Sequence, residues 1–341
     1  MKKIIGLLVL IIIVVASFFS YQYYKKNYTS NVVKEGFVLI PSNASFKQIL
    51  DSISPFLADK KSFEEVAIAK NLNQFHHAGR YEIKASMDNK SIVNMIKAGN
   101  QTPEQFRIIA FDNVYQMMGR VAKKTEVDSL EFINGFDKIA KQKGLENAES
   151  LKRFFFVDTY QFFWTVTPEE FFETFEKQYQ DFWNPERIAK EKKLGLSRDQ
   201  IYALASIVYK ESGGRTDEQR TIAGLYLNRY KKGMKLQSDP TVIYAINQAN
   251  HFTKTIKRVY YKDLKTPSPY NTYANAGIPP GPICIVDKSS VDAVLNPEQH
   301  NYIFMAADPD KLGFHRFTSS DIEHAQNARD YQKWLNEKNI R

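Results

Sequence analysis

An apolar run at the N-terminus constrains this chain more than any other feature. After Met1 and two lysines, the sequence IIGLLVLIIIVVASFFS leads into a cluster of tyrosines, which Lys25 and Lys26 follow. A helix of about 20 uncharged residues is long enough to cross the hydrocarbon core of a bilayer. Tyrosines at the edge of such a run are typical of the membrane interface. We therefore predict a transmembrane helix over residues 1–24.

A cleavable signal peptide is the alternative interpretation of this run, with Val-Ala-Ser at 15–17 as a poor cleavage site. The uninterrupted apolar residues from Ile4 to Phe19 and the lack of an Ala-x-Ala pattern favour a retained anchor. Lysines flank both ends, so the positive-inside rule does not fix the orientation. We expect a short N-terminal tail, with everything after the helix exported.

The remaining chain has the composition of a folded protein. Its 341 residues are enough for two or three compact units, and 43% of them are hydrophobic and 13% aromatic. The net charge of +9 comes from lysines interleaved with acidic residues, so we expect no nucleic-acid partner, although a membrane or an anionic polymer fits. Because Cys284 is the only cysteine, no intramolecular disulfide and no cysteine-based zinc or redox motif can form. We expect it to be a small core residue.

Strand, turn and helix follow one another repeatedly over residues 25–124. Residues 36–53 read as a short β run, a polar turn and apolar residues at helical spacing. Residues 105–122 repeat this order, with Asn43 and Asp112 at matching turn positions that tolerate left-handed backbone. The pattern predicts small α+β modules.

A looser copy of the pattern lies between these two. It has a strand around Tyr81–Ile83, a polar turn, and a helix from Ser91 that Gly99 ends. Modules of this kind present a groove to a polymer, and a plain α+β core without a ligand is equally compatible with the sequence.

Residues 125–195 are predicted to be mainly helical and rich in aromatic residues. Thr167 as N-cap and Pro168 at the first helical position begin one helix. One face of it carries a stripe that is typical of a core: Phe171, Phe172, Phe175, Tyr179 and Phe182. Before it, we expect residues 157–162 to be irregular, with Asp158 and Tyr160 lining a cleft.

A glutamate at the end of the next helix is the strongest candidate for chemistry. Ser197 and Gln200 form a capping box that begins this helix. Residues 201, 204, 208 and 211 are spaced by 3, 4 and 3, so Glu211 continues an apolar face before a serine and two glycines. The helix dipole and the apolar surroundings both raise the pKa of this acid, as a general acid near neutral pH requires. From spacing alone, a frayed and solvated glutamate is the alternative.

Three further segments surround this candidate. A helix is expected from Thr216 to Gly233, followed by a turn that Pro240 fixes and that crowds Gln237, Ser238 and Asp239 together.

The second segment is a loop, 268–283, with four prolines and two glycines. It frames Tyr270, Asn271, Thr272 and Tyr273, aromatic and amide groups that suit sugar recognition, and an ordinary surface loop is the alternative. In the third, residues 302–318 read as two β runs joined by a polar turn that bring His315 near the end of the chain.

Missing motifs narrow the chemistry. There is no HExxH, no phosphate-binding loop and no GxSxG, and we expect neither a metal nor a cofactor. Glycosidases usually need two carboxylates, and Asp239 is the only other acid in a similarly constrained motif. If Glu211 acts alone, the substrate itself must supply the second function.

These segments resemble the endolytic murein transglycosylases, also called YceG-like proteins, over nearly the whole chain. The resemblance is carried by LASIVYKES, LNRYKKGMKLQSDPTVIYAI, YNTYANAGIPPGPI and the late HRF. It implies an α+β fold in four parts: a transmembrane anchor (1–24), a LysM-like strand-helix region (25–124), an aromatic-rich helical connecting region (125–195), and a mixed, mainly helical catalytic domain with a lysozyme-like active-site helix (196–341). The family's turn glycine in the first LysM-like unit is Asn43 here.

The resemblance also implies a bacterial lyase in the inner (cytoplasmic) membrane, with its catalytic part on the periplasmic side. It would cleave peptidoglycan glycan strands between N-acetylmuramic acid and N-acetylglucosamine and leave a 1,6-anhydro end. Glu211 would be the general acid and base. The implied substrate contacts are Asn228, Gln237, Asp239, Tyr270, Asn271, Thr272 and Tyr273, with Ser212 and His315 as further candidates. Peptidoglycan synthases are the protein partners that it suggests.

Two other functions remain compatible with these residues. One is a glycan-binding scaffold without activity, and the other is a muramidase-type hydrolase that uses Asp239 as its second carboxylate.

Overall fold

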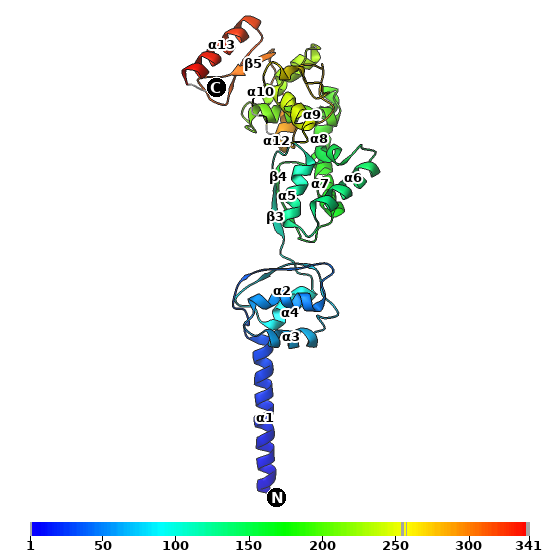
Figure 1. Ribbon diagram of the computed structural model, residues 1–341, viewed down its shortest axis with the longest axis vertical. Helices are drawn as coiled ribbons and strands as arrows, with labels where there is room; N and C mark the ends of the chain where they lie inside the picture. The colour runs from blue at the N-terminus through cyan, green and yellow to red at the C-terminus, as the bar shows by residue number, and fades with distance from the viewer. Residues whose placement is uncertain (1, 254–255, 257, 339–341) are drawn as a thin grey trace. The chain divides into compact units, whose positions relative to one another are not determined.

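The computed structural model describes residues 2–253, 256 and 258–338 (Figure 1). Its Cα atoms cluster into two compact units. Unit 1 comprises Met1–Phe106, Ala122–Asp128 and Gln161–Thr167, and unit 2 comprises Arg107–Val121, Ser129–Tyr160 and Pro168–Arg341. The structure is α+β and mainly helical. The predicted division of the chain into four parts, with boundaries after residues 24, 124 and 195, stays a prediction.

The N-terminal apolar run forms one long helix, α1 (Lys2–Tyr28). Its apolar side chains are exposed along the whole run, and the helix is long and apolar enough to cross a membrane. A membrane anchor and a signal sequence both present such a helix. The last turn differs, because Asn27 is buried and the Asn89 side chain donates a hydrogen bond to the carbonyl of Lys26, 2.9 Å away. This end of α1 is therefore part of the packed body of unit 1.

Unit 1 contains two of the predicted strand-turn-helix patterns. Its secondary structure comprises β1 (Gly36–Ile40), α2 (Phe46–Ile53), a 3-10 turn η1 (Ser54–Phe56), α3 (Lys60–Ala69), β2 (Gly79–Ile83) and α4 (Asn89–Lys97). Strands β1 and β2 pair antiparallel with Val38 opposite Tyr81, and both side chains are buried. The two patterns are confirmed.

The start of α4 differs from the expected one. The helix begins at Asn89, because the Asp88 side chain is the N-cap and accepts a hydrogen bond from the Ser91 backbone N–H at 2.7 Å. Ser91 therefore lies in the first turn. Asp and Ser are both good N-caps, so the order of the two residues left this choice open in the sequence.

The third pattern is confirmed as β3 (Glu104–Ile108) and α5 (Val114–Val121), which a 3-10 turn η2 (Ala122–Lys124) extends. Its strand pairs with β4 (Asp158–Phe162). Our expectation that residues 157–162 are irregular is therefore wrong. Tyr160 is buried against Phe175, with 4.5 Å between ring centroids, and Asp158 is exposed. Tyr160 is thus a core residue and does not line a cleft.

Unit 2 holds most of the helices. Besides α5, they are α6 (Ser129–Gln142), the 3-10 helix η3 (Ala148–Phe154), α7 (Pro168–Phe182), α8 (Pro185–Leu194), α9 (Arg198–Ser212), α10 (Gln219–Lys231), α11 (Asp239–Ala249), the 3-10 turn η4 (Asp263–Lys265), α12 (Lys288–Leu295) and α13 (Asp321–Glu337). The aromatic stripe of α7 is buried as predicted. Strands β5 (Phe304–Ala307) and β6 (His315–Thr318) form the expected hairpin, and α13 packs against it.

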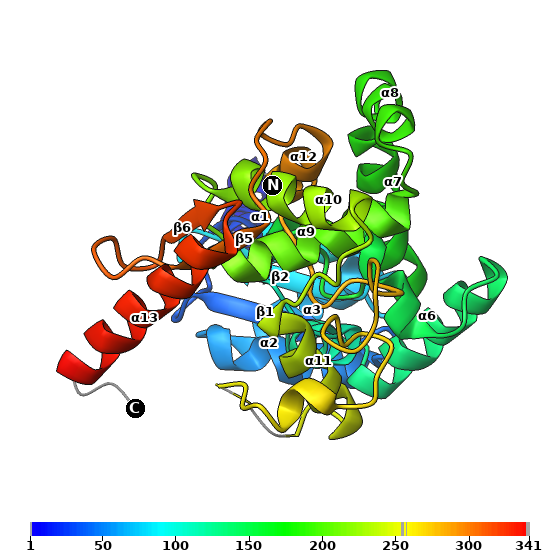
Figure 2. The same cartoon turned by 90° about the horizontal axis from the view of Figure 1, so that it is seen from above.

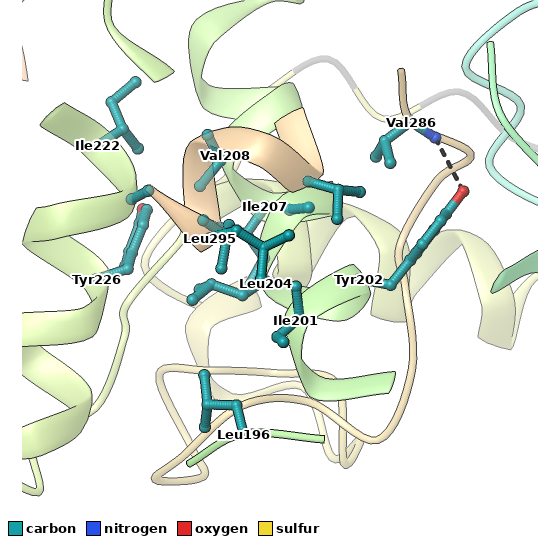
Figure 3. Close-up of a cluster of buried hydrophobic side chains, with 14 of the residues drawn as sticks. Leu196, Ile201, Tyr202, Leu204, Ile207, Val208, Ile222, Tyr226, Val286 and Leu295 are labelled. Carbon is teal, nitrogen blue, oxygen red and sulfur yellow. Dashed lines mark hydrogen bonds between the residues drawn. The ribbon is translucent and has the colours of Figure 1, made fainter. Parts of the chain in front are cut away.

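Helix α9 is the centre of unit 2 and packs against α10 and α12 (Figure 2). Figure 3 shows side chains of α9, α10 and α12 meeting in one cluster of buried residues. Every residue from 201 to 208 is buried, so this part of α9 is enclosed on all sides and not only on the apolar face that its spacing indicated. A helix enclosed in this way holds its last turn in a fixed position.

Candidate active site

Both ends of α9 are fixed by local hydrogen bonds. At its start, the capping box is confirmed: the Ser197 hydroxyl accepts from the Gln200 backbone N–H at 3.2 Å, and the Gln200 side chain accepts from the Ser197 backbone N–H at 2.9 Å. At its end, Gly213 and Gly214 have φ of 59° and 78°, in the left-handed region that favours glycine. The helix therefore stops one residue after Glu211.

The carboxylate of Glu211 is held through one of its two oxygens. Oε1 accepts a hydrogen bond from the Tyr226 hydroxyl of α10 at 2.7 Å and another from the Ser238 hydroxyl at 2.6 Å. Both donors are buried. Within the described residues, Oε2 has no hydrogen-bond partner, so it is the oxygen that remains free for a ligand.

The surroundings of Glu211 raise its pKa. Burial is the largest cause, because it disfavours the charged form, and the charge of Asp239 adds to it. The hydrogen bonds from Ser238 and Tyr226 and the nearby His315 act in the opposite direction and leave a net rise. The rise due to apolar surroundings agrees with the expectation from the sequence.

A cavity of about 450 Å³ opens beside Glu211, and we call it the Glu211 cavity. Four of the residues that we predicted as substrate contacts line it together with Glu211: Gln237, Asp239, Tyr273 and His315. The lining also includes Arg229, His324, Tyr226 and a short apolar wall with Phe304 and Met305. The structure thus brings half of the expected site together.

The polar groups of the Glu211 cavity hold one another in place. The Tyr273 hydroxyl donates to Asp239 at 2.7 Å, and both its burial and this carboxylate raise the pKa of Tyr273. The Gln237 side chain accepts a hydrogen bond from the Arg229 guanidinium, and Gln237 adopts a left-handed φ of 55°. Such backbone is uncommon for a residue other than glycine and here turns the chain into α11.

Asn271 and Thr272 lie behind the cavity and organise its loop. The Asn271 amide donates to the carbonyls of Leu264 and Thr266, both at 2.9 Å. The Thr272 hydroxyl accepts from the Ser238 backbone N–H at 3.0 Å. Both side chains are buried, so they position Tyr273 and Ser238.

Three predicted site residues, Ser212, Asn228 and Tyr270, do not line the Glu211 cavity. Ser212 is buried, and its hydroxyl donates to the Tyr209 carbonyl at 3.2 Å. The Asn228 side chain donates to the carbonyl of His300 at 2.8 Å. Tyr270 packs on Tyr244 and lines a different cavity. None of the three is part of the lining that the structure describes around Glu211, and their predicted sugar contacts stay predictions.

His315 lines the Glu211 cavity and is held there by two contacts with the buried carboxylate of Glu218. Its backbone N–H donates to Oε1 of Glu218 at 2.9 Å, and its Nδ1 lies 3.1 Å from Oε2 of the same carboxylate. The tautomer of His315 that carries its proton on Nδ1 would donate a hydrogen bond to this carboxylate. Glu218 precedes α10, which begins at Gln219, three residues later than the sequence indicated.

Tyr226, Glu218 and Arg229 were not predicted as site residues. Each acts through a contact between elements that are far apart in the chain, and spacing along one helix cannot reveal such contacts. Ser238 was visible as part of the polar turn before Pro240, but its partner was not.

Two remaining expectations concern metals and the cysteine. Among the described residues, no group of three or more His, Cys, Asp or Glu side chains is placed to hold a metal ion. Cys284 is fully buried, as predicted, and this burial raises the pKa of its thiol to about 12.

Comparison with known proteins shows sequence similarity over most of the chain. The sequence pattern of the YceG-like family matches residues 38–330. An endolytic murein transglycosylase of Bacillus subtilis (strain 168) is 30% identical over 319 residues, which is 88% of this chain and 85% of that protein. A protein of the same name from Streptococcus pneumoniae (serotype 2, strain D39) is 30% identical over 145 residues, 42% of this chain and 24% of that protein.

A solved structure agrees with this similarity. The crystal structure of a yceG-like protein from Listeria monocytogenes, at 2.6 Å, covers 86% of this chain and 98% of its own, with 26% identity and a TM-score of 0.56. Family pattern, sequence relatives and fold point the same way, and the chain belongs to the YceG-like family.

Proposed function

We propose that this protein is an endolytic murein transglycosylase. It cleaves peptidoglycan glycan strands between N-acetylmuramic acid and N-acetylglucosamine and leaves a 1,6-anhydro end. The observation that carries the proposal is the Glu211 carboxylate, with Oε1 held by two hydroxyls, Oε2 free beside a cavity, and a raised pKa. The similarity to the Bacillus subtilis enzyme supports it.

Glu211 handles both protons of this reaction. Protonated Glu211 gives its proton to the oxygen that leaves the anomeric carbon C1 as the glycosidic bond breaks. The resulting carboxylate then takes the proton of the muramic acid C6 hydroxyl, whose oxygen forms the new bond to C1. The proton count balances without water, so a single carboxylate is enough. The hydrogen bonds from Tyr226 and Ser238 stabilise the carboxylate between the two steps.

The lining of the Glu211 cavity suits an amino sugar. Asp239, Gln237 and Tyr273 offer acceptors and donors to hydroxyl and acetamido groups. The apolar wall formed by Phe304 and Met305 offers contact to the apolar face of a sugar ring.

We also propose that α1 is a retained single-pass anchor in the inner membrane, with unit 2 on the periplasmic side. The uninterrupted apolar run from Ile4 to Phe19 and the lack of an Ala-x-Ala pattern support retention, and α1 is long and apolar enough to cross a bilayer. The lysines at both ends leave the orientation to be measured.

The test is cleavage of purified peptidoglycan by the full chain in detergent, in water labelled with oxygen-18, followed by mass spectrometry. We expect anhydromuramyl ends without the label. Because general acid-base catalysis contributes about 10²- to 10⁴-fold, Glu211→Gln should lose at least about 100-fold in rate. The matched control is Glu173→Gln, which removes an exposed carboxylate of α7. Wild-type rates for Glu211→Gln, or a wild-type enzyme that makes no anhydro ends, would contradict the proposal.

The position of Asp239 favours one alternative function, a hydrolase. Asp239 lines the same cavity as Glu211, which supports a hydrolase that uses two carboxylates as the alternative. Such an enzyme would leave reducing ends that carry the oxygen-18 label, and Asp239→Asn would abolish their formation. A glycan-binding scaffold would yield no new ends, while Glu211→Gln would still retain glycan in a pull-down.

A further inference from the structure

Unit 2 contains a second cavity, larger than the Glu211 cavity. Its volume is about 1100 Å³, and it shares no lining residue with the Glu211 cavity. Its walls come from the start of α5, residues 144–153, α11 and the loop 268–283. We call it the Tyr270 cavity.

The walls of the Tyr270 cavity combine aromatic rings with amides. Four phenylalanine or tyrosine rings line it, from Tyr115, Tyr244, Phe252 and Tyr270. Four amide side chains do so as well: Asn113, Gln116, Asn147 and Gln248. Flat rings offer surface to the apolar face of a sugar, and amides can both donate to and accept from hydroxyl and acetamido groups.

Part of the wall is held rigid by a buried ion pair that the proposed reaction does not use. Lys152 is almost fully buried, and its ammonium group is paired with Glu149. It also donates to the Asp112 carbonyl at 2.8 Å and to the Tyr244 hydroxyl at 3.1 Å. Glu149 in turn accepts from the Val114 backbone N–H at 2.8 Å. These bonds join α5, η3 and α11, so the shape of the cavity is largely formed before a ligand enters.

An unsatisfied donor lies at the same place. Asn113 is buried, and its side-chain oxygen accepts from the Gln116 backbone N–H at 2.8 Å and caps α5. Its Nδ2 is buried and has no hydrogen-bond partner within the described part of the chain. Burying a donor without a partner is costly. A hydroxyl or acetamide oxygen of a ligand, or a water that the ligand holds, would satisfy it.

The charges of the lining favour an uncharged ligand. The lysine and the arginine that line the cavity are already paired inside the protein, Lys152 with Glu149 and Arg153 with Asp199. Glu146 is exposed and adds a negative charge at the rim. A ligand that depends on carboxylates, such as the peptide stems of peptidoglycan, therefore fits less well than N-acetylglucosamine units.

The two cavities are linked by the elements that line them. In the loop 268–283, Tyr270 faces one cavity and Tyr273 the other. In α11, Asp239 at the start lines the Glu211 cavity, and Tyr244 and Gln248 further on line the Tyr270 cavity. A glycan bound at one cavity thus contacts the elements that shape the other.

We propose that the Tyr270 cavity is a second glycan-binding site, which holds N-acetylated sugars of a peptidoglycan strand away from the bond that is cleaved at Glu211. The identity of the glycan rests on the proposed function. The binding itself does not require cleavage, and this difference allows the two proposals to be tested separately.

The experiment uses the full chain in detergent as Glu211→Gln, which should process a ligand at least about 100-fold more slowly than wild type, and titrates it with the uncharged tetramer of N-acetylglucosamine by calorimetry. We expect two binding sites. Tyr115→Ala and Gln248→Ala should each weaken one site about tenfold and leave the other unchanged. The matched control is Tyr261→Ala, which removes a tyrosine that is 91% exposed and lines neither cavity. Thermal unfolding of each variant verifies that it is folded.

A second measurement uses the active enzyme. Tyr115→Ala should raise KM for long glycan strands about tenfold with kcat unchanged, and KM for the shortest strand that is cleaved should stay the same. One binding site that is insensitive to both substitutions would overturn the inference. Binding of a free stem peptide that Tyr115→Ala weakens, without binding of the tetramer, would also overturn it. If wild type leaves no anhydro ends but the Tyr115-sensitive sugar site is present, the proposed function fails and this inference stands.

Discussion

Glu211 combines a buried charge that costs stability with the position that the proposed reaction uses. Its pKa is raised in the folded protein, chiefly by burial, while in the unfolded chain a glutamate has an ordinary pKa of about 4.3. As the pH rises above the unfolded value, the unfolded state loses this proton first. The folded protein is then destabilised increasingly until the pH passes the folded pKa.

Glu211→Gln should therefore melt at the same or a higher temperature than wild type near neutral pH. The difference should shrink towards about pH 4, where the carboxyl is protonated in both states. Thermal unfolding of both proteins across this pH range measures it. Glu173→Gln serves as the exposed control, and a larger gain for Glu211→Gln in acid than at neutral pH would contradict the argument.

Tyr226 tunes the same carboxyl. Its hydrogen bond favours the charged form and lowers the pKa of Glu211. Tyr226→Phe removes the bond, so the pKa of Glu211 should rise, and the fall in kcat/KM on the alkaline side should move to higher pH. Ser238→Ala should act in the same direction. A loss of rate without any movement of the pH profile would mean that these hydroxyls act only on packing.

At the scale of elements, helix α10 lies very close to the loop that contains Glu298 and His300, and Gly224 of α10 is at the contact. A Cβ added at Gly224 would lie 2.6 Å from the Glu298 carbonyl oxygen and 2.7 Å from Nε2 of His300. Gly119 in α5 has no neighbour within 4 Å of the same position. Both residues have ordinary helical backbone, so the pair isolates the effect of close approach.

Gly224→Ala should destabilise the protein by about 1 to 3 kcal/mol because the loop has to move. Gly119→Ala should stabilise it by about 0.5 to 1 kcal/mol because alanine is the better helix former. Chemical denaturation of both variants checks the two signs. If the two substitutions changed the stability equally, the close contact between Gly224 and the loop would not explain the effect.

The sequence was most informative where local chemistry decides the structure. Caps and prolines predicted the starts of α7 and α9, and the glycine pair predicted where α9 ends. Strand β4 was missed because its alternation of exposed and buried residues lies within an aromatic run that also suits a core helix or an irregular segment.

The site was only half visible for a related reason. Glu211, Asp239 and Tyr273 stand in turns or at helix ends with strong local signals. The hydroxyl donors of Tyr226 and Ser238 belong to the site only because α9 and α10 pack together and α11 begins beside them, and those contacts are tertiary.

For the whole molecule, the junction between α1 and unit 1 decides where the chain can be cut. Removal of residues 1–24 should give a folded protein that no longer sediments with membranes, because Lys26 and Asn27 keep their contacts with unit 1. Removal of residues 1–28 should lower the melting temperature of unit 1, since the buried Asn89 amide loses one of its two acceptors. Membrane fractionation and thermal unfolding of the two truncations distinguish these outcomes. Equal melting temperatures would show that the last turn of α1 is dispensable.

The same junction has a consequence for how an anchored enzyme would meet its substrate. The end of α1 is built into unit 1 through Asn27 and Asn89, so no slack tether separates the two. With α1 in a bilayer, unit 1 would stay close to the lipid head groups, and the chain would diffuse only in the plane of the membrane. The search for glycan would then take place in two dimensions, where confinement to a thin layer raises the effective concentration of each partner.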